Sequence, residues 1–479
     1  MNGPRDGRKL ALGAVALAGA MVVYLGSRLS CDRGSASSHG GDGSLLEKAE
    51  RAAPVPAATP IALGPEDAHA HDVAAFDRDA GTPPPPPSLA DARAFARGSN
   101  ALGLALFEQL GVGERNAVIS PLALSTMLLS TWSVSGGDTA AELQRAIGLH
   151  GAPAHFADVA GGYLGAHAAE EAAVTFGLVH RLFADAQFPF ALPSVDARLS
   201  PLGAAVEPVP FEDAPERARQ RINEWMATAT LHKIQELYPA GRITSGSRLV
   251  LAAAASFRAN WAEEFPENAT QPRAFRVAPG KTVLPQTMNV ERGFGATSAP
   301  GARILEIPYT ENAFALTIVL PNRDDGLRDL ESSLSVEEIE AWGRSLERSA
   351  ESLHLALPKF EIEPAESTSM TAALRGIGLN LPFDPLRADF SPLLSFEGGA
   401  GAQGRLYLDD VVEKAFIRID ETVTEAGAGV GGMMEESGRQ MPPRSPRPFL
   451  VDHPFLFLVR DTRTGMILFM GHVVNPLEK

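Results

Sequence analysis

The sequence predicts an α+β fold for residues 89–479. Apolar residues recur at helical spacing in the early part of this region, and strand-like apolar runs dominate its later part. Helices first and strands later are typical of an α+β domain. No linker-like segment interrupts the region, so we expect one large domain of roughly 390 residues.

Four segments are predicted to be helical: residues 89–110, 116–134, 136–149 and 222–237. In the second segment, Ser120 followed by Pro121 is typical of a helix start. In the third, Asp138 or Thr139 is the expected cap, with Glu142 completing a capping box.

Seven later segments are predicted to be strands: residues 248–257, 302–309, 314–322, 353–363, 405–420, 455–461 and 466–474. The last two flank the sequence "TRTG", which ends in Gly465 and indicates a hairpin connection.

Residues 1–31 are predicted to be a targeting segment. Three basic residues come first: Arg5, Arg8 and Lys9. An uncharged apolar run over residues 10–25 follows, which is typical of an export signal and is nearly long enough to span a bilayer. Cys31 then stands where a bacterial lipoprotein is cleaved and lipidated, although Arg28 departs from that pattern. A lipid on Cys31, an uncleaved membrane anchor and secretion stay open, and each places the domain in the cell envelope or outside the cell.

Residues 32–88 are predicted to be a disordered tether. They are rich in Gly, Ala, Ser, Pro and acidic residues, which bury too little apolar surface to offset chain entropy. The proline run over residues 83–87 favours a stiff, extended chain. We interpret His69 and His71 as solvated linker residues rather than as a metal site.

Composition and motifs exclude several functions. A net charge of −16 argues against a general nucleic-acid binder. With a single cysteine, no intrachain disulfide can form. The motifs of zinc proteases, serine hydrolases and P-loop proteins are all missing from the sequence. We therefore predict a protein that is not an enzyme and holds no metal or cofactor.

Several motifs, in order, make the chain resemble the serpins, the serine protease inhibitor superfamily. They include "NAVISPLALSTMLLSTW", "LPKFEIE", "EKAFIRIDETVTEAGAG" and "DHPFLFLVRDTRTGMILFMGHVVNP". The resemblance covers residues 89–479, and we expect a bacterial member. It implies a monomer with three β-sheets, about nine helices and an exposed reactive-centre loop over about residues 421–448.

The resemblance implies a suicide-type inhibitor. A serine protease, or a cysteine protease, would attack the loop and form an acyl-enzyme. The cut loop would then insert as a new central strand and carry the protease with it. The alternative is a non-inhibitory serpin that acts as a binding or chaperone-like module.

Side chains alternate faces along a strand. From Thr424 onward one face carries small, mostly apolar residues and the other carries the one charge, Glu425. This pattern suits a strand that slides between two others, whereas a plain flexible loop is the alternative. By resemblance, the hinge of the loop comprises Glu421, Val423, Thr424, Glu425, Ala426, Gly427, Ala428 and Gly429. The family has glycine where Val423 stands, and a β-branched residue there would slow insertion.

Two scissile bonds are the main candidates, and the bonds after Met441, Arg444 and Arg447 are further alternatives. Counting seventeen residues inclusively from Glu421, the family's usual spacing, reaches Ser437. The bond Ser437–Gly438 would suit an elastase- or subtilisin-like protease. The alternative bond Arg439–Gln440 would suit a trypsin-like protease, whose acidic pocket pairs with arginine.

The shutter beneath the opening strands departs from the family. Ser120 matches the family's serine, but Ala253 stands in the Asn position and Glu413 in the His position. We expect Glu413 either to bond Ser120 or to lie exposed. Trp261 matches the family's tryptophan at the end of the sheet where the loop inserts, and its alternative role is core packing.

The helix that binds heparin in some members has a counterpart at residues 142–171. Arg145 is its only basic residue besides histidines, so we expect no heparin binding.

Overall fold

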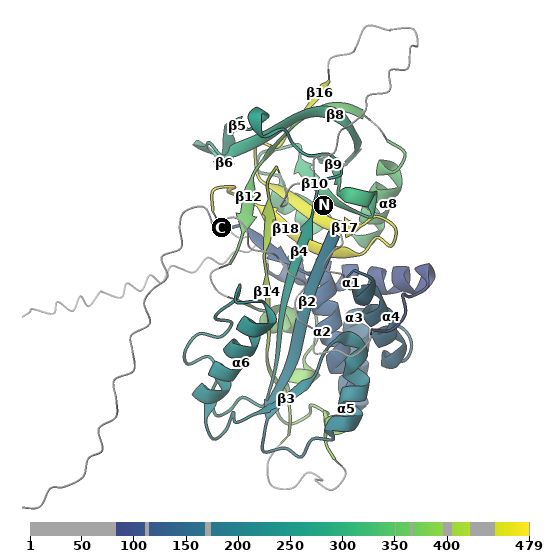
Figure 1. Cartoon of the computed structure of the whole chain (residues 1–479), viewed down its shortest axis with the longest axis vertical. Coiled ribbons are helices and arrows are strands. Elements are labelled where there is room, and N and C mark those ends of the chain that lie inside the picture. Colours follow the sequence, from purple (N-terminus) through teal and green to yellow (C-terminus); the bar gives the residue numbers. More distant parts are fainter. Residues whose placement is uncertain are drawn as a thin grey trace, which may run out of the picture. The chain divides into compact units, whose positions relative to one another are not determined.

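The computed structural model describes residues 83–110, 115–167, 174–349, 351–364, 367–395, 405–421 and 446–478 (Figure 1). These residues belong to one unit, Ala70–Lys479. The predicted targeting segment, including Cys31, and all but the end of the predicted tether lie outside them. None of the helices within them has the length and hydropathy of a membrane span.

Nine α-helices occur in the described residues: α1 Leu89–Leu110, α2 Pro121–Ser133, α3 Gly137–Ile147, α4 Pro153–Ala166, α5 Leu192–Leu199, α6 Pro215–Ala229, α7 Leu327–Ser333, α8 Val336–Leu346 and α9 Thr371–Gly376. The central helix is α2, in which every residue is buried. Its start follows from the sequence, because the Ser120 hydroxyl accepts a hydrogen bond from the Ala123 amide at 3.2 Å and Pro121 opens the first turn.

A five-stranded sheet carries the features that matter for function. Its strand order is β13-β14-β4-β2-β3. The strands are β13 Thr368–Ser369, β14 Leu408–Ala415, β4 Leu249–Ala259, β2 Val174–Asp185 and β3 Val206–Val209. Strands β2 and β4 are antiparallel, whereas β14 and β4 are parallel neighbours.

The other large sheet has nine strands and consists of two halves that share β8 Gln286–Ala299. Residues 295–299 of β8 pair with β9, and residues 287–294 pair with β11. The remaining strands are β1 Ala117–Ile119, β5 Gln271–Pro272, β9 Ala302–Pro308, β10 Phe314–Pro321, β11 Glu351–Pro358, β16 Arg447–Leu450, β17 Phe455–Asp461 and β18 Ile467–Val473. Two short pairs complete the structure: β6 Phe275–Ala278 with β7 Lys281–Val283, and β12 Phe360–Ile362 with β15 Ile417–Ile419.

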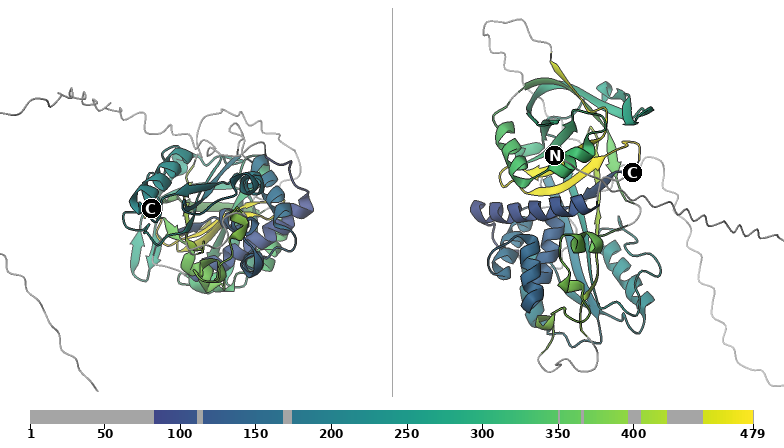
Figure 2. Two further views of the ribbon diagram at one scale, coloured as in Figure 1. Left: turned by 90° about the horizontal axis from the view of Figure 1, so that it is seen from below. Right: turned by 180° about the vertical axis from the view of Figure 1, so that it is seen from behind.

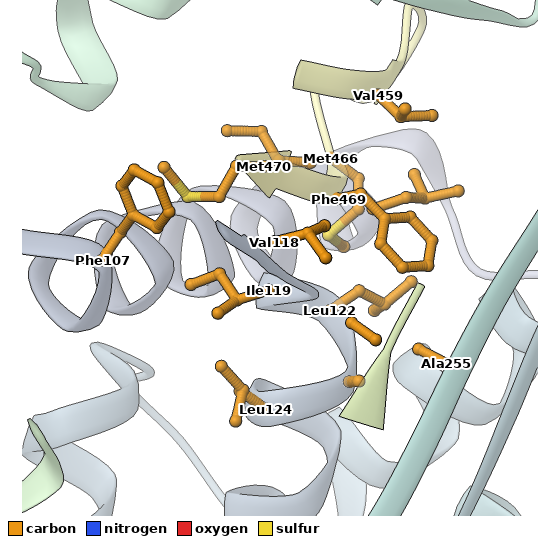
Figure 3. Packing of buried hydrophobic residues seen from close by; sticks show 14 of the residues in the cluster. Phe107, Val118, Ile119, Leu122, Leu124, Ala255, Val459, Met466, Phe469 and Met470 are labelled. Carbon is orange, nitrogen blue, oxygen red and sulfur yellow. The ribbon is translucent and has the colours of Figure 1, made fainter. Parts of the chain in front are cut away.

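The five-stranded sheet is buried on both faces. Ala253 and Ala255 of β4 face the main core with α2, whereas Ala252 and Ala254 belong to a second cluster under α6. Figure 1 and the right-hand view of Figure 2 show α6 on one side of the sheet and α2 to α5 on the other. Figure 3 shows the main core where α1, β1, α2 and β18 meet, with the labelled side chains of Phe107, Ile119, Leu122 and Met470 pointing together.

Three local predictions were wrong. The helix predicted over residues 222–237 ends at Ala229, where Leu231 and His232 take left-handed backbone angles. The chain turns there so that Ile234 and the residues after it can pack beneath α6. The N-cap of α3 is Gly136, because Thr139 instead accepts a hydrogen bond from the Asp389 amide.

The third error concerns two long strands. The strand predicted over residues 353–363 divides into β11 and β12 at Lys359, and the one predicted over residues 405–420 divides into β14 and β15 at Phe416. Each of these two segments leaves its first sheet at that residue and continues into the two-stranded β12–β15 ladder. The pattern of apolar residues along the sequence does not reveal that a strand passes from one sheet to another.

The last prolines of the predicted tether lie against α4. Gly161, Gly162 and Gly165 of that helix have no room for a Cβ atom, because prolines 83–85 and the Pro201 backbone occupy the space. Because these three glycines have no side chains, the proline segment can approach the helix closely.

Candidate functional site

We call the paired residues 249–255 of β4 and 408–415 of β14 the seam. Ala253 lies opposite Glu413 in its register. Because the strands are parallel, both reach the same end of the sheet, where β4 leads to Trp261 and β14 leads through β15 to Glu421. Glu421 is the first residue of the predicted loop and the last one described in this part of the chain. The chain therefore starts the loop at the end of the seam.

A tryptophan holds the loop's starting point in place. The indole N–H of Trp261 donates a hydrogen bond to the Asp420 carbonyl oxygen at 2.9 Å. The ring is 3% exposed and stacks on Tyr309 with 4.6 Å between ring centroids. Trp261 thus contributes both to core packing and to fixing the residue next to Glu421, so the two roles considered for it are compatible.

Glu421 is held by two polar side chains. Its carboxylate lies 2.6 Å from the Lys359 ammonium and accepts a hydrogen bond from the Thr270 hydroxyl at 2.6 Å. Burial acts to raise the pKa of Glu421, but the hydrogen bonds from Lys359 and Thr270 outweigh it, and the pKa lies below its ordinary value. The charged Glu421 carboxylate therefore connects the start of the loop to Thr270 and Lys359, on the side of the molecule that holds the nine-stranded sheet.

Glu413 is a residue of the seam, and it is buried rather than exposed. Its side chain is 2% exposed, and its carboxylate oxygens accept from the Ser120 amide at 3.2 and 3.4 Å. The Ser120 hydroxyl donates elsewhere, to the Leu468 carbonyl oxygen at 2.6 Å. Burial raises the pKa of Glu413 to about 8, although the Ser120 amide acts to lower it. Of the two alternatives predicted for Glu413, the structure shows the contact with Ser120, and the backbone amide of Ser120 makes it.

One row of residues crosses the sheet at this level. His180 of β2, Ala253 of β4, Glu413 of β14 and Thr368 of β13 are successive partners in register. Directly paired residues point to the same face. His180 is buried and contacts the Ser130 hydroxyl at 2.8 Å, so α2 contacts the row near both of its ends. Sequence reasoning missed His180, whose only signal is a histidine within the apolar run "FGLVHRLFA".

The far end of the loop joins the other sheet. The described residues continue from Pro446, and β16 pairs in parallel with β11 from Arg447 onward. The hinge residues after Glu421, from Val423 to Gly429, lie outside the described residues. So do both candidate bonds, Ser437–Gly438 and Arg439–Gln440. Among the residues that the structure describes, no cluster of three His, Cys, Asp or Glu side chains could hold a metal ion.

Comparisons with known proteins agree with this arrangement. A family model described as serpin (serine protease inhibitor) matches residues 97–476. Serpin B6 of Pongo abelii is 31% identical over 392 residues, which cover 81% of this chain and 100% of the relative. The leukocyte elastase inhibitor of Bos taurus is 30% identical, with 75% of this chain and 93% of the relative covered. Both relatives are eukaryotic, and the bacterial origin of this chain stays a prediction.

Solved structures share the fold. Uncleaved ovalbumin superposes with a TM-score of 0.69 at 24% identity and covers 80% of this chain and 100% of its own. The thermophilic serpin tengpin, in its native state, gives a TM-score of 0.69 at 21% identity, with 84% and 100% covered. The predicted fold class, with its sheets and helices, is confirmed. The chain belongs to the serpin family.

Proposed function

We propose that this chain inhibits a protease by offering its loop as a substrate and inserting the cut loop into the seam. The family consists mostly of protease inhibitors, and serpin B6 and leukocyte elastase inhibitor are among the relatives. The observation that carries the proposal is the direct parallel pairing of β4 and β14 beside the start of the loop.

Strand geometry favours insertion. A chain that turns back after Glu421 would run antiparallel to both β14 and β4. Insertion would therefore replace one parallel ladder by two antiparallel ladders, and antiparallel pairing is slightly more stable per residue. The added strand also pairs backbone groups that the loop leaves to water. Free energy would fall once the seam opens, so the uncut loop holds the protein in a metastable state.

The trap depends on the timing of one covalent step. The nucleophile of the protease would attack the carbonyl carbon of Ser437, or of Arg439, and form an ester or thioester with it. The amine of Gly438, or of Gln440, would leave. Insertion then removes the acyl-enzyme from its productive geometry before water can cleave it. The chain supplies no catalytic group, and we propose that it is not an enzyme.

We propose an elastase- or subtilisin-like target with cleavage at Ser437–Gly438, and a trypsin-like target with cleavage at Arg439–Gln440 as the alternative. The name of the bovine relative, leukocyte elastase inhibitor, supports the first choice. We further propose a monomer without heparin activation, held in the cell envelope through residues 1–31 or a lipid on Cys31, or secreted. These proposals rest on the sequence patterns described above.

The test is complex formation. The full chain is incubated with one elastase-like, one subtilisin-like and one trypsin-like protease, and the products are separated on denaturing gels. A band at the summed mass supports covalent trapping, and the mass of the released C-terminal peptide distinguishes Ser437 from Arg439. Cleavage by all three proteases without a complex contradicts the proposal for these classes.

That second outcome would favour a non-inhibitory binding or chaperone-like module. Two departures from the family point toward it: Val423 in the hinge, and the pair Ala253 and Glu413 at the shutter. The protease would cut a non-inhibitory module at the loop and then release the cleaved protein without forming a covalent complex. Its protease would stay active.

A further inference from the structure

The seam contains two buried acids, Asp410 and Glu413, and Asp410 is paired with Arg242. The insertion mechanism does not use Glu413. Glu413 lies opposite Ala253, so the carboxyl group sits at the line along which β4 and β14 must separate. Its side chain faces the N-terminal end of α2 and accepts a hydrogen bond from the Ser120 amide. A carboxylate with one weak hydrogen bond in an apolar interior is much less stable than the neutral acid.

Opening the seam would change these surroundings. Separation of β4 from β14 removes Ala253 from beside Glu413 and admits water to the carboxyl group. Hydration favours the charged form, so the open sheet releases a proton that the closed sheet holds. Proton binding and sheet closure are thus coupled through the same side chain.

We propose that Glu413 is a pH-dependent gate, whose protonated form keeps the seam closed and whose ionisation opens it. The inference rests on the proposed function, because the seam is where the cut loop would insert. Alkaline conditions would therefore speed insertion, and acidic conditions would keep the loop out of the sheet.

The direction follows from the shift at this site. Burial raises the pKa of Glu413 from an ordinary 4.5 to about 8. A closed state that binds a proton more tightly than the open state loses stability as pH rises from the ordinary value through the raised one. The gate therefore works between about pH 5 and pH 8. Over that interval the opening equilibrium changes by up to about tenfold per pH unit.

Other charged groups lie on the elements around Glu413, and each could also make the opening of the seam depend on pH. Helix α2 and strands β1 and β13 contain no charged residue. The titratable side chains on the remaining neighbouring strands are Asp409, Asp410 and Lys414 on β14, Arg258 on β4, His180, Arg181 and Asp185 on β2, and Arg460, Asp461 and His472 on β17 and β18.

Of these groups, His180 is the nearest in the row, next to Ala253. It contacts the Ser130 hydroxyl at 2.8 Å. Asp410 bonds Arg242, and His472 bonds Glu331. Lys414 follows Glu413 on the strand and points to the opposite face. A variant of Glu413 that keeps all of these groups therefore isolates the effect of the Glu413 carboxyl group.

The experiment measures hydrogen exchange of the seam amides. Full-length wild type and Glu413→Gln are exchanged at pH 6, 7, 8 and 9, and peptides from residues 249–259 and 408–415 are followed by mass spectrometry. Dividing the wild-type rate by the Glu413→Gln rate at each pH cancels intrinsic exchange and the contribution of His180. Glu413→Met, which is uncharged and of similar length, serves the same purpose if the Gln variant folds poorly.

We expect this ratio to rise at least about threefold between pH 6 and pH 8, and to level off above. The matched control is Glu224→Gln on the exposed face of α6, whose rates should equal wild type at every pH. A ratio that changes less than about threefold overturns the gate. Trapping of a protease is scored separately, so a flat ratio with intact trapping refutes the gate alone. A rising ratio without trapping refutes the proposed function and leaves the gate.

Discussion

The Glu421 carboxylate lies 2.6 Å from the Lys359 ammonium, and this pair holds the start of the loop against the end of β11. Glu421 is largely buried, whereas about a third of the Lys359 side chain, 35%, is exposed. A charged pair of this kind contributes through its hydrogen bonds more than through long-range attraction. It sets where the loop leaves the body of the protein.

Removal of the Glu421 charge should destabilise the uncut protein. Glu421→Gln loses the charged partner of Lys359 and weakens the bond from Thr270. We expect the free energy of unfolding to fall by about 1–3 kcal/mol, the usual cost of losing a hydrogen bond to a charged group. Urea unfolding followed by fluorescence measures this. An unchanged midpoint and slope would mean that the pair contributes nothing.

The same carboxyl group should give the protein an acid-sensitive component. Its pKa is lowered in the folded state, so its stabilisation is complete above the ordinary value of 4.5 and is lost as pH falls through the lower folded value. Wild type should therefore lose more stability than Glu421→Gln below about pH 5. Thermal midpoints measured from neutral to acidic pH test this. Parallel curves for the two proteins would contradict it.

Helix α6 should restrain insertion, because it covers one face of the seam. Glu207 of β3 bridges Arg181 of β2 and Arg221 of α6 at 2.5 Å each. Arg221→Gln breaks the bridge to the helix. We expect a larger trapped fraction of protease, with a stability loss below about 1 kcal/mol because Arg221 is half exposed.

The control for this change is Arg217→Gln, an exposed position on the same helix. It should trap as wild type does. Equal trapped fractions for both variants, measured by gel densitometry, would show that α6 does not limit insertion.

Hinge chemistry gives a third kind of prediction. Thr424 is the first inserting residue by resemblance, and arginine there would have to be buried unpaired at a cost of several kcal/mol. Thr424→Arg should therefore be cleaved at the wild-type rate but form no complex. Normal trapping by this variant would rule out insertion at this residue. Thr424→Ser, which keeps a small side chain, should trap normally.

The sequence patterns predicted where helices and strands occur better than they predicted which distant residues each side chain contacts. The Ser120 cap and the start of α2 follow from two adjacent residues, and the hairpin ending in Gly465 follows from a local turn signal. The end of α6 depends instead on what Ile234 packs against, which no local pattern contains. For Glu413 the pattern gives only a strand. Whether that strand's acid faces water or α2 depends on elements distant in the chain.

The role of the seam can be tested by locking it. Ala252 and Val412 are register partners, both buried and both small, and neighbouring strands bring Cα atoms within disulfide range. The variant carries Ala252→Cys and Val412→Cys, with Cys31→Ser to remove the other thiol. A variant with Ala252→Cys and Cys31→Ser alone is its control.

The most direct measurement compares protease trapping by the locked variant before and after reduction. If the loop inserts between β4 and β14, the oxidised protein is cleaved without forming a complex, and reduction restores the complex to the level of the control. If the oxidised and reduced proteins trap the protease equally, the loop does not enter this seam and the account is wrong.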